Sequence, residues 1–168
     1  MRIVVSDSSC LIDLRKASLL QTFLRLPYDI LIPDTLFEEE LLKFTTEEKA
    51  LLRGGLKVMD LPGESVLRAQ HVVSNDPRLS IHDGFAFALS EMSPGCILLS
   101  GDGGLRTLAE KHDIEVRGVL WVVDEIYRNG LAGAEDILTV LRLFVGDPTI
   151  RLPRRLLGVY VKRYESLD

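Results

Sequence analysis

The sequence has few of the features that mark a secreted or membrane-bound protein. It contains two cysteines, Cys10 and Cys96, and both lie in apolar runs. This placement favours buried thiols in a reducing compartment over a disulfide or a metal site. The first residues contain no apolar stretch of signal-peptide length, and no apolar run approaches the roughly 20 residues of a membrane-spanning helix. We therefore expect a soluble cytoplasmic protein that makes no contact with membranes.

Glycine-rich loops that bind nucleotide phosphates are also missing. The segment GDGGL, residues 101–105, has neither the P-loop nor the dinucleotide-binding spacing, so its glycines predict a tight turn between a strand and a helix. A phosphoryl-transfer enzyme with a nucleophilic aspartate would carry a second aspartate two residues later. Ser9 occupies that position after Asp7, which argues against this class of enzyme.

The charge and apolar content that are present fit an ordinary globular domain. Hydrophobic residues make up 46% and charged residues 27% of the 168 residues, which is enough for one domain with a real core. The net charge of −5 argues against non-specific adhesion to nucleic acid. Residues 151–168 differ, with five basic residues against two acidic ones and a net charge of +3. This segment is either a contact for a phosphate backbone or a solvated helix face, and both interpretations stay open.

Short apolar strands alternate with helical patterns along the chain. The predicted strands cover residues 2–6, 29–32, 56–59, 96–100 and 114–117, and the predicted helices cover 8–26, 36–43, 46–53, 64–73, 81–92, 103–112, 120–129, 134–145 and 154–164. Several strands are apolar on both faces, which is typical of a parallel sheet covered by helices on either side. The sequence therefore predicts an α/β fold with three α/β/α layers and a parallel sheet of four to five strands.

Acidic residues follow the ends of these strands. Asp7 comes directly after the first predicted strand, and Asp102 follows the fourth after one glycine. The carboxyl ends of parallel neighbours meet at one edge of a sheet, so we expect these two carboxylates to lie close together. Asp83 lies in the first turn of the helix before the fourth strand, and residues 38–40 are glutamates on the helix after the second strand.

Each acid also has a purely structural explanation. Asp7, Asp83 and Asp102 suit the first turn or cap of a helix, and a run of glutamates suits a solvated face. A cluster of carboxylates without a cation would repel and raise its own pKa values. Such a cluster is tolerated where it holds Mg²⁺ or Mn²⁺, which prefer oxygen ligands. The functional interpretation therefore depends on the joint position of the acids.

Four segments carry a resemblance to a known family. They are IVVSDSSCLIDL, LIPDTLFEEELL, SIHDGFAFALS and CILLSGDGGLRTLAEKHDIEV, in this order along the chain. Together they resemble the PIN domain, the nuclease module of VapC-like toxins and related prokaryotic proteins. The resemblance implies a PIN-like nuclease domain over residues 1–130. Residues 131–168 are then expected to form a C-terminal helical extension packed on the same domain.

By this resemblance the catalytic residues, which are also the ligands of Mg²⁺ or Mn²⁺, are Asp7, Glu39, Asp83 and Asp102. Ser9 and Ser100 match positions where the family often has a hydroxyl near the site. Glu39 fits the family spacing best, since it stands three residues after Leu36, and Glu40 is the next candidate because Leu41 follows it. Arg106, one helical turn past Asp102, is expected to contact either a phosphate or a nearby acid.

The resemblance implies a divalent-metal-dependent endoribonuclease that cleaves RNA phosphodiester bonds, either alone or as the toxin of a toxin–antitoxin pair. The alternative is a catalytically inactive PIN-fold module that binds RNA or protein. A DNA-directed flap-type nuclease shares the metal chemistry, but the chain is too short for the usual DNA-clamping additions. The expected partners are RNA, a small antitoxin protein in the toxin role, and a second copy of the chain in a homodimer.

Overall fold

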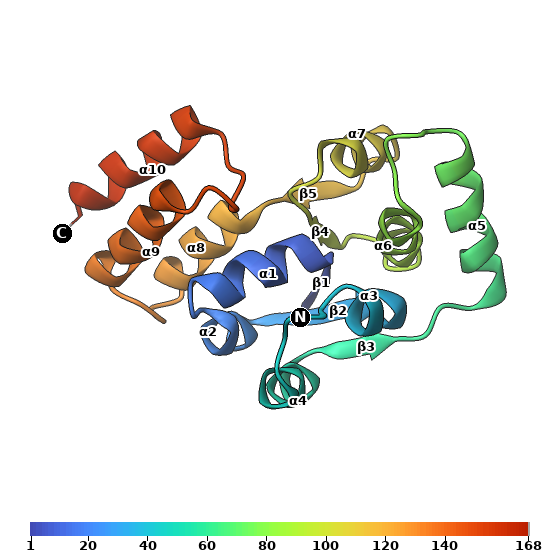
Figure 1. Cartoon of the computed structure of the whole chain (residues 1–168), viewed down its shortest axis with the longest axis horizontal. Helices are drawn as coiled ribbons and strands as arrows, with labels where there is room; N and C mark the ends of the chain where they lie inside the picture. The colour runs from blue at the N-terminus through green and yellow to red at the C-terminus, as the bar shows by residue number, and fades with distance from the viewer. Residues whose placement is uncertain (168) are drawn as a thin grey trace.

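A parallel sheet of five strands forms the centre of the computed structural model, which describes residues 1–167 (Figure 1). The strands are β1 (Arg2–Ser6), β2 (Tyr28–Pro33), β3 (Lys57–Met59), β4 (Ile97–Leu99) and β5 (Glu115–Arg117). They are hydrogen-bonded in the order β3-β2-β1-β4-β5, and every neighbouring pair is parallel. The predicted α/β class and parallel sheet are therefore confirmed.

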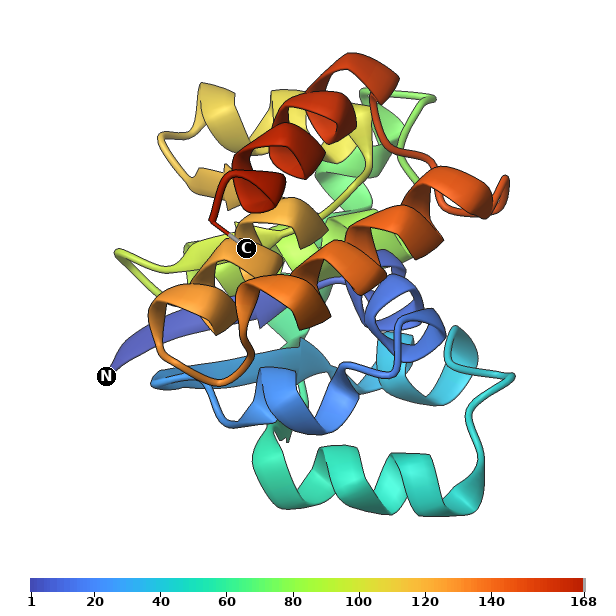
Figure 2. The same ribbon diagram turned by 90° about the vertical axis from the view of Figure 1, so that its left-hand side faces the viewer.

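Helices cover both faces of this sheet. They are α1 (Ser8–Lys16), α2 (Leu20–Leu24), α3 (Asp34–Glu39), α4 (Thr46–Gly55), α5 (Gly63–Ser74), α6 (Ile81–Glu91), α7 (Gly103–Lys111), α8 (Val119–Arg128), α9 (Ala134–Gly146) and α10 (Arg154–Glu165). Helices α5, α6 and α7 lie on one side, and α1, α2 and α8 lie on the other (Figure 1). Figure 2, which faces the C-terminal helices, shows α9 and α10 in front of α8. Within residues 1–167, no helix combines the length and apolar content needed to cross a membrane.

The C-terminal helices share the core of the sheet domain. Leu141 and Phe144 of α9, and Leu157 and Tyr164 of α10, are buried in the same apolar cluster as β1 and β4. The Tyr164 hydroxyl donates a 2.6 Å hydrogen bond to Asp124 of α8. The extension therefore packs directly on the domain that carries the sheet.

Local signals in the sequence explain most of the element boundaries. Thr45 and Glu48 form a capping box at the start of α4, and Ser80 forms a second one with Asp83 at the start of α6. The single helix predicted over residues 8–26 is wrong, because α1 ends at Lys16 and α2 begins at Leu20. Ser18 adopts φ +57° in this break, and the Leu19 N–H bonds back to the Leu14 carbonyl over 2.8 Å.

The register of the sheet decides where the first acid lies. β1 is between β2 and β4, and Ser6 pairs with Leu99. One residue further on, the Asp7 N–H still donates to the Leu99 carbonyl over 3.0 Å. The chain therefore leaves β1 and β4 at the same edge, which brings Asp7 beside Ser100.

A close approach of two helices positions the third acid. Gly84 of α6 packs against α5, where a Cβ at this position would lie 2.9 Å from both the Ala69 carbonyl oxygen and a methyl of Val73. Glycine is required here because a backbone oxygen cannot move aside as a flexible side chain can. Asp83 is the preceding residue, so the α5–α6 contact also sets the position of its carboxylate.

Gly84→Ala is expected to lower the free energy of unfolding by about 1–3 kcal/mol, because the added Cβ would press on the α5 backbone. Urea unfolding followed by circular dichroism measures this difference. Gly54→Ala in α4 is the matched control, since a Cβ there meets nothing within 4 Å and alanine favours the helix by up to about 1 kcal/mol. Equal stability of the two variants would contradict the close packing of α5 on α6.

Candidate metal centre

Asp7 is a buried carboxylate at the edge of the sheet. It is the N-cap of α1, and its Oδ1 accepts hydrogen bonds from the Ser9 N–H at 2.9 Å, the Ser9 hydroxyl at 2.6 Å and the Cys10 N–H at 3.4 Å. Its side chain and backbone together are only 5% exposed. Burial raises its pKa to about 6, although the hydrogen bonds from Ser100, Ser9 and Cys10 act in the opposite direction.

Two hydroxyl groups link Asp7 to the turn that carries Asp102. The Ser100 hydroxyl donates to Asp7 Oδ2 over 2.5 Å and accepts from the Asp102 N–H over 3.0 Å. The Ser9 hydroxyl donates to Asp7 Oδ1 and accepts from the Gly101 N–H over 3.3 Å. Asp102 in turn caps α7, with Oδ1 accepting from the Leu105 N–H over 2.8 Å. The two serines named by the resemblance therefore join the first and last acids.

Asp83 lies near the same acids but is held by its own helix. Its Oδ2 accepts from the Ser80 N–H over 2.8 Å, and its N–H donates to the Ser80 hydroxyl over 3.1 Å. The pKa of Asp83 is raised, first by burial and then by the negative charges of Asp102 and Glu40, against the effect of the Ser80 bonds. Asp83 is therefore affected by the charges of Asp102 and Glu40, although its direct hydrogen bonds are to Ser80 alone among the residues that the structure describes.

The glutamates at the end of α3 point in different directions. Glu40 Oε1 accepts a 2.6 Å hydrogen bond from the hydroxyl of Ser8, the residue next to Asp7. Glu39 has a side chain that is 56% exposed and lies 3.3 Å from His82 Nε2. Glu38 pairs with Arg53 over 3.0 Å, at the outer surface. The sequence favours Glu39 as the fourth acid, whereas these contacts favour Glu40.

Ser8 and His82 both lie next to Glu40, and the sequence analysis did not assign either residue to the site. Ser8 fixes Glu40 beside α1, and His82 Nδ1 lies 3.7 Å from Glu40 Oε2. The signal for Ser8 was present in the hydroxyl pair that follows Asp7. Its partner was not predictable, because Glu40 is 32 residues away along the chain.

The residues fit an ion held mainly by water and phosphate rather than one enclosed by protein. No three acidic, histidine or cysteine side chains within residues 1–167 converge into a group that could hold a metal alone. Mg²⁺ at phosphate-processing sites is usually bound by one or two carboxylates, with water and substrate phosphate supplying the rest. Asp7 Oδ2 accepts one hydrogen bond, from Ser100, which leaves a lone pair free for a cation. A donor set made of carboxylates suits Mg²⁺ or Mn²⁺.

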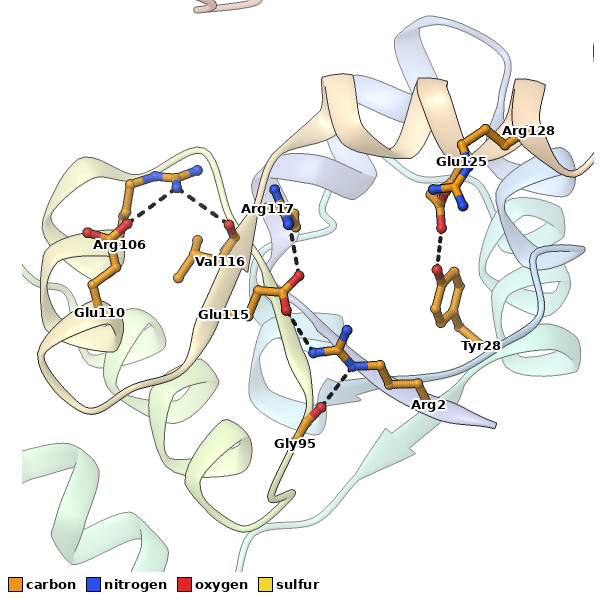
Figure 3. Close-up of polar contacts among 10 residues, drawn as sticks. All are labelled: Arg2, Tyr28, Gly95, Arg106, Glu110, Glu115, Val116, Arg117, Glu125 and Arg128. Carbon is orange, nitrogen blue, oxygen red and sulfur yellow. Dashed lines mark hydrogen bonds and ion pairs between the residues drawn. The ribbon is translucent and has the colours of Figure 1, made fainter.

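Arg106 does not contact the acids of the site. Its guanidinium lies 3.5 Å from Glu110 on the next turn of α7 and 3.5 Å from the Val116 carbonyl oxygen of β5 (Figure 3). Both contacts are long, and 44% of the side chain is exposed. Arg106 was expected to contact either a phosphate or a nearby acid. Glu110 is such an acid, and the guanidinium has further N–H donors that are available to a phosphate.

A groove of about 740 Å³ opens beside Ser100 and Asp102. One wall comes from α1, a second from the turns that follow β4 and β5, and a third from residues 149–160. Lys16 Nζ donates a 2.8 Å hydrogen bond to the Thr149 hydroxyl, which ties the third wall to α1. Asp13 of α1 also lines the groove, and its pKa is raised to about 6, chiefly by burial and further by the negative charge of Asp147, while Lys16 lowers it.

Comparison with known families gives one match for the chain. A family model described as a PIN domain, DUF3368, matches residues 3–166. The matched region includes the acidic edge of the sheet and the C-terminal helices α9 and α10. A search of curated proteins found no match.

Asp13→Asn is expected to stabilise the protein at neutral pH. The folded pKa of Asp13, about 6, lies above its value of 3.8 in the unfolded chain, so the stability contributed by the protonated carboxyl is lost as the pH rises from 3.8 to about 6. At pH 7.5 the gain from Asp13→Asn should be about 1–2 kcal/mol, which allows for the partial exposure of the side chain, and only a small part of it should be present near pH 4. Urea unfolding at several pH values measures it. Asp60→Asn, the same substitution at an exposed position, is the control. A gain for Asp13→Asn that is the same at pH 4 and pH 7.5 would refute the assignment.

Proposed function

The chain belongs to the PIN-domain family, and on this premise we propose that it is a divalent-metal-dependent endoribonuclease that hydrolyses RNA phosphodiester bonds. The observation that supports the proposal most directly is the link from Asp7 through the Ser100 hydroxyl to Asp102. This link holds two carboxylates together at the edge of the sheet, beside a groove that is open to solvent. Ligands in open α/β sheets bind at this edge, outside the carboxyl ends of the strands.

Asp7 and Asp102 would hold Mg²⁺ or Mn²⁺, with Asp83 and a glutamate from the end of α3 completing the acidic set. When bound, such an ion lowers the pKa of a water molecule and neutralises charge on the phosphate oxygens. Ser9 and Ser100 keep the Asp7 carboxylate in one orientation, because both of its oxygens accept from their hydroxyls. Ser8 does the same for Glu40.

No side chain beside Asp7 is suited to covalent attack on phosphorus. Cys10 is 2% exposed, and its pKa is raised by burial and then by the charges of Asp7 and Asp13, so it stays a shielded thiol. The Ser9 and Ser100 hydroxyls both donate to Asp7, the carboxylate that would hold the ion, so they orient that carboxylate rather than serve as nucleophiles. Hydrolysis by a water molecule is therefore the reaction that these residues favour.

A catalytically inactive PIN-fold module that binds RNA or protein is the second candidate function. It is favoured by the finding that no three side chains within residues 1–167 form a metal-binding group by themselves. The toxin role with a small antitoxin partner is a narrower form of the nuclease proposal. That role and the homodimer stay predictions.

Asp7→Asn and Asp102→Asn are each expected to lower metal-dependent RNA cleavage at least about a hundredfold, because each removes a carboxylate that would hold the ion. Asparagine also caps helices, so both variants should remain folded. A gel assay of a mixed RNA pool with Mg²⁺ or Mn²⁺, with and without a chelator, measures cleavage. Asp60→Asn is the charge-matched control and should cut as the wild type does.

The outcomes separate the two candidate functions. If Asp7→Asn cuts RNA at the wild-type rate, the metal site is misassigned and the cleavage arises elsewhere. If folded wild-type protein cuts no RNA with either metal, the inactive binding module becomes the better proposal.

A comparison of Glu39 and Glu40 tests which glutamate serves the site. Glu40→Gln is expected to lower metal-dependent cleavage about tenfold or more, and Glu39→Gln less than about threefold, because Glu40 is the one fixed beside Asp7 through Ser8. The two changes are chemically identical and adjacent, so each serves as the control for the other. A larger loss for Glu39→Gln would restore the assignment made from the sequence.

A further inference from the structure

We propose that the groove beside Asp102 binds one single strand of RNA next to the bond that is cut, and that the C-terminal extension supplies one wall of this binding site. The inference rests on the proposed function, because RNA is taken as the bound strand on the ground that it is the proposed substrate. It adds the place where the RNA lies, the residues that hold it and the preference for unpaired bases.

The position of the groove connects it to the acids. Ser9, Ser100 and Asp102 line it together with Leu156 and Tyr160 of α10. Figure 1 shows the segment before α10 passing close to the end of β5 and the start of α8. The volume of about 740 Å³ falls in the ~300–1,000 Å³ range of ligand-binding clefts. A strand bound at the acids would therefore continue into the groove.

Three arginines give the groove a chemistry that suits phosphates. Arg106, Arg117 and Arg151 line it, against Asp13 and Asp102. Asp102 belongs to the metal centre, which leaves three cations against one acid along the rest of the path. Guanidinium groups match phosphate oxygens in charge and in geometry.

The three arginines are not equally free. Arg117 pairs with Glu115 over 3.0 Å, and Arg106 has its long contact to Glu110 (Figure 3). Arg151 is exposed, and within the part of the chain that the structure describes it has no ion pair or side-chain hydrogen bond. Arg151 is therefore the residue from which the largest phosphate contact is expected.

Aromatic and apolar side chains line the same groove. Trp121 of α8 and Tyr160 of α10 line the groove, together with Leu156, which is 45% exposed. The Arg163 guanidinium lies over the Tyr160 ring, 4.6 Å from its centroid, and steadies it. Bases stack on such rings only when they are unpaired, because a duplex hides their faces. The combination favours a single strand over a duplex.

A helix of a partner protein is the competing occupant. Such a helix would place an apolar face in a groove of this size. The three lining arginines, and the presence of Ser100 and Asp102 in the same lining, favour RNA instead. A bound apolar helix would bury Arg151 without a partner.

The test measures RNA binding in the non-cleaving Asp7→Asn background with Mg²⁺. The probes are a short unstructured fluorescent oligoribonucleotide and a fully paired RNA hairpin of the same composition, followed by anisotropy. Adding Arg151→Ala should weaken single-strand binding about fivefold and reduce the slope of log K against log salt by about 0.7. Arg155→Ala is the matched control, since Arg155 is also exposed but lies outside the groove, and it should change little.

A second pair of variants tests stacking without removing the packing of α10. Tyr160→Leu should weaken single-strand binding about fivefold or more, whereas Tyr160→Phe keeps the ring and should retain it. The hairpin should bind more weakly than the single strand and respond little to either change. Thermal unfolding of each variant confirms that the fold is intact.

Each outcome bears on a different claim. If Arg151→Ala binds the single strand as tightly as Arg155→Ala, and Tyr160→Leu as tightly as Tyr160→Phe, the RNA groove is refuted and a protein partner becomes its better occupant. Equal binding of the hairpin and the single strand would also overturn it. If wild-type protein cuts no RNA but both groove variants weaken binding, the groove stands and the nuclease proposal fails.

Discussion

The hydrogen bonds from Ser9 and Ser100 to the buried Asp7 carboxylate are the interactions on which the candidate site depends. A carboxylate with so little exposure is costly unless its oxygens are satisfied. The same two hydroxyls accept from the N–H groups of Gly101 and Asp102, so they tie the start of α1 to the turn before α7. The bonds that make the buried charge tolerable therefore also set the distance between the two acids. The two serine hydroxyls therefore account for both the stability of the buried carboxylate and the geometry of this edge of the sheet.

The acidic edge is less stable than the fold could make it. Burial raises the pKa values of Asp7 and Asp83, and the charges of Asp102 and Glu40 raise that of Asp83 further. A neutral side chain would avoid the burial of a charge at position 7, and at position 83 it would also remove the repulsion by Asp102 and Glu40. Perturbed carboxylates gathered beside a groove are typical of functional sites, where activity is kept at the expense of stability. Helix capping alone explains single members of the set, but it does not explain why these helices begin facing one another.

The sequence predicted the parts of the site that follow from the order of the strands. It missed those that depend on the direction of a side chain around its helix, or on contacts between residues far apart in the sequence. Asp7 and Asp102 could be placed together because parallel neighbours end at one edge. The sequence could not decide which of Glu39 and Glu40 faces the site. Neighbouring residues in a helix point in directions roughly 100° apart, and the distance in sequence from Leu36 is compatible with either glutamate. No glycine or proline marks the break at Ser18. The apolar residues on either side of it, Leu14 and Leu19, were assigned to one helical face although they are five residues apart. Residues of α1 and α10 line one groove, and no local sequence pattern indicates that they do.

The C-terminal extension has two roles that cannot be separated physically. Phe144 and Tyr164 fill the core that also contains β1 and β4, and Asp124 of α8 receives both the Tyr164 hydroxyl and Arg163. The same anchoring holds Tyr160 and Leu156 against the groove, because they lie on α10 one turn from buried residues. A chain cut near residue 130 would expose apolar core and lose a groove wall together. The extension is therefore part of the fold as well as part of the proposed binding site.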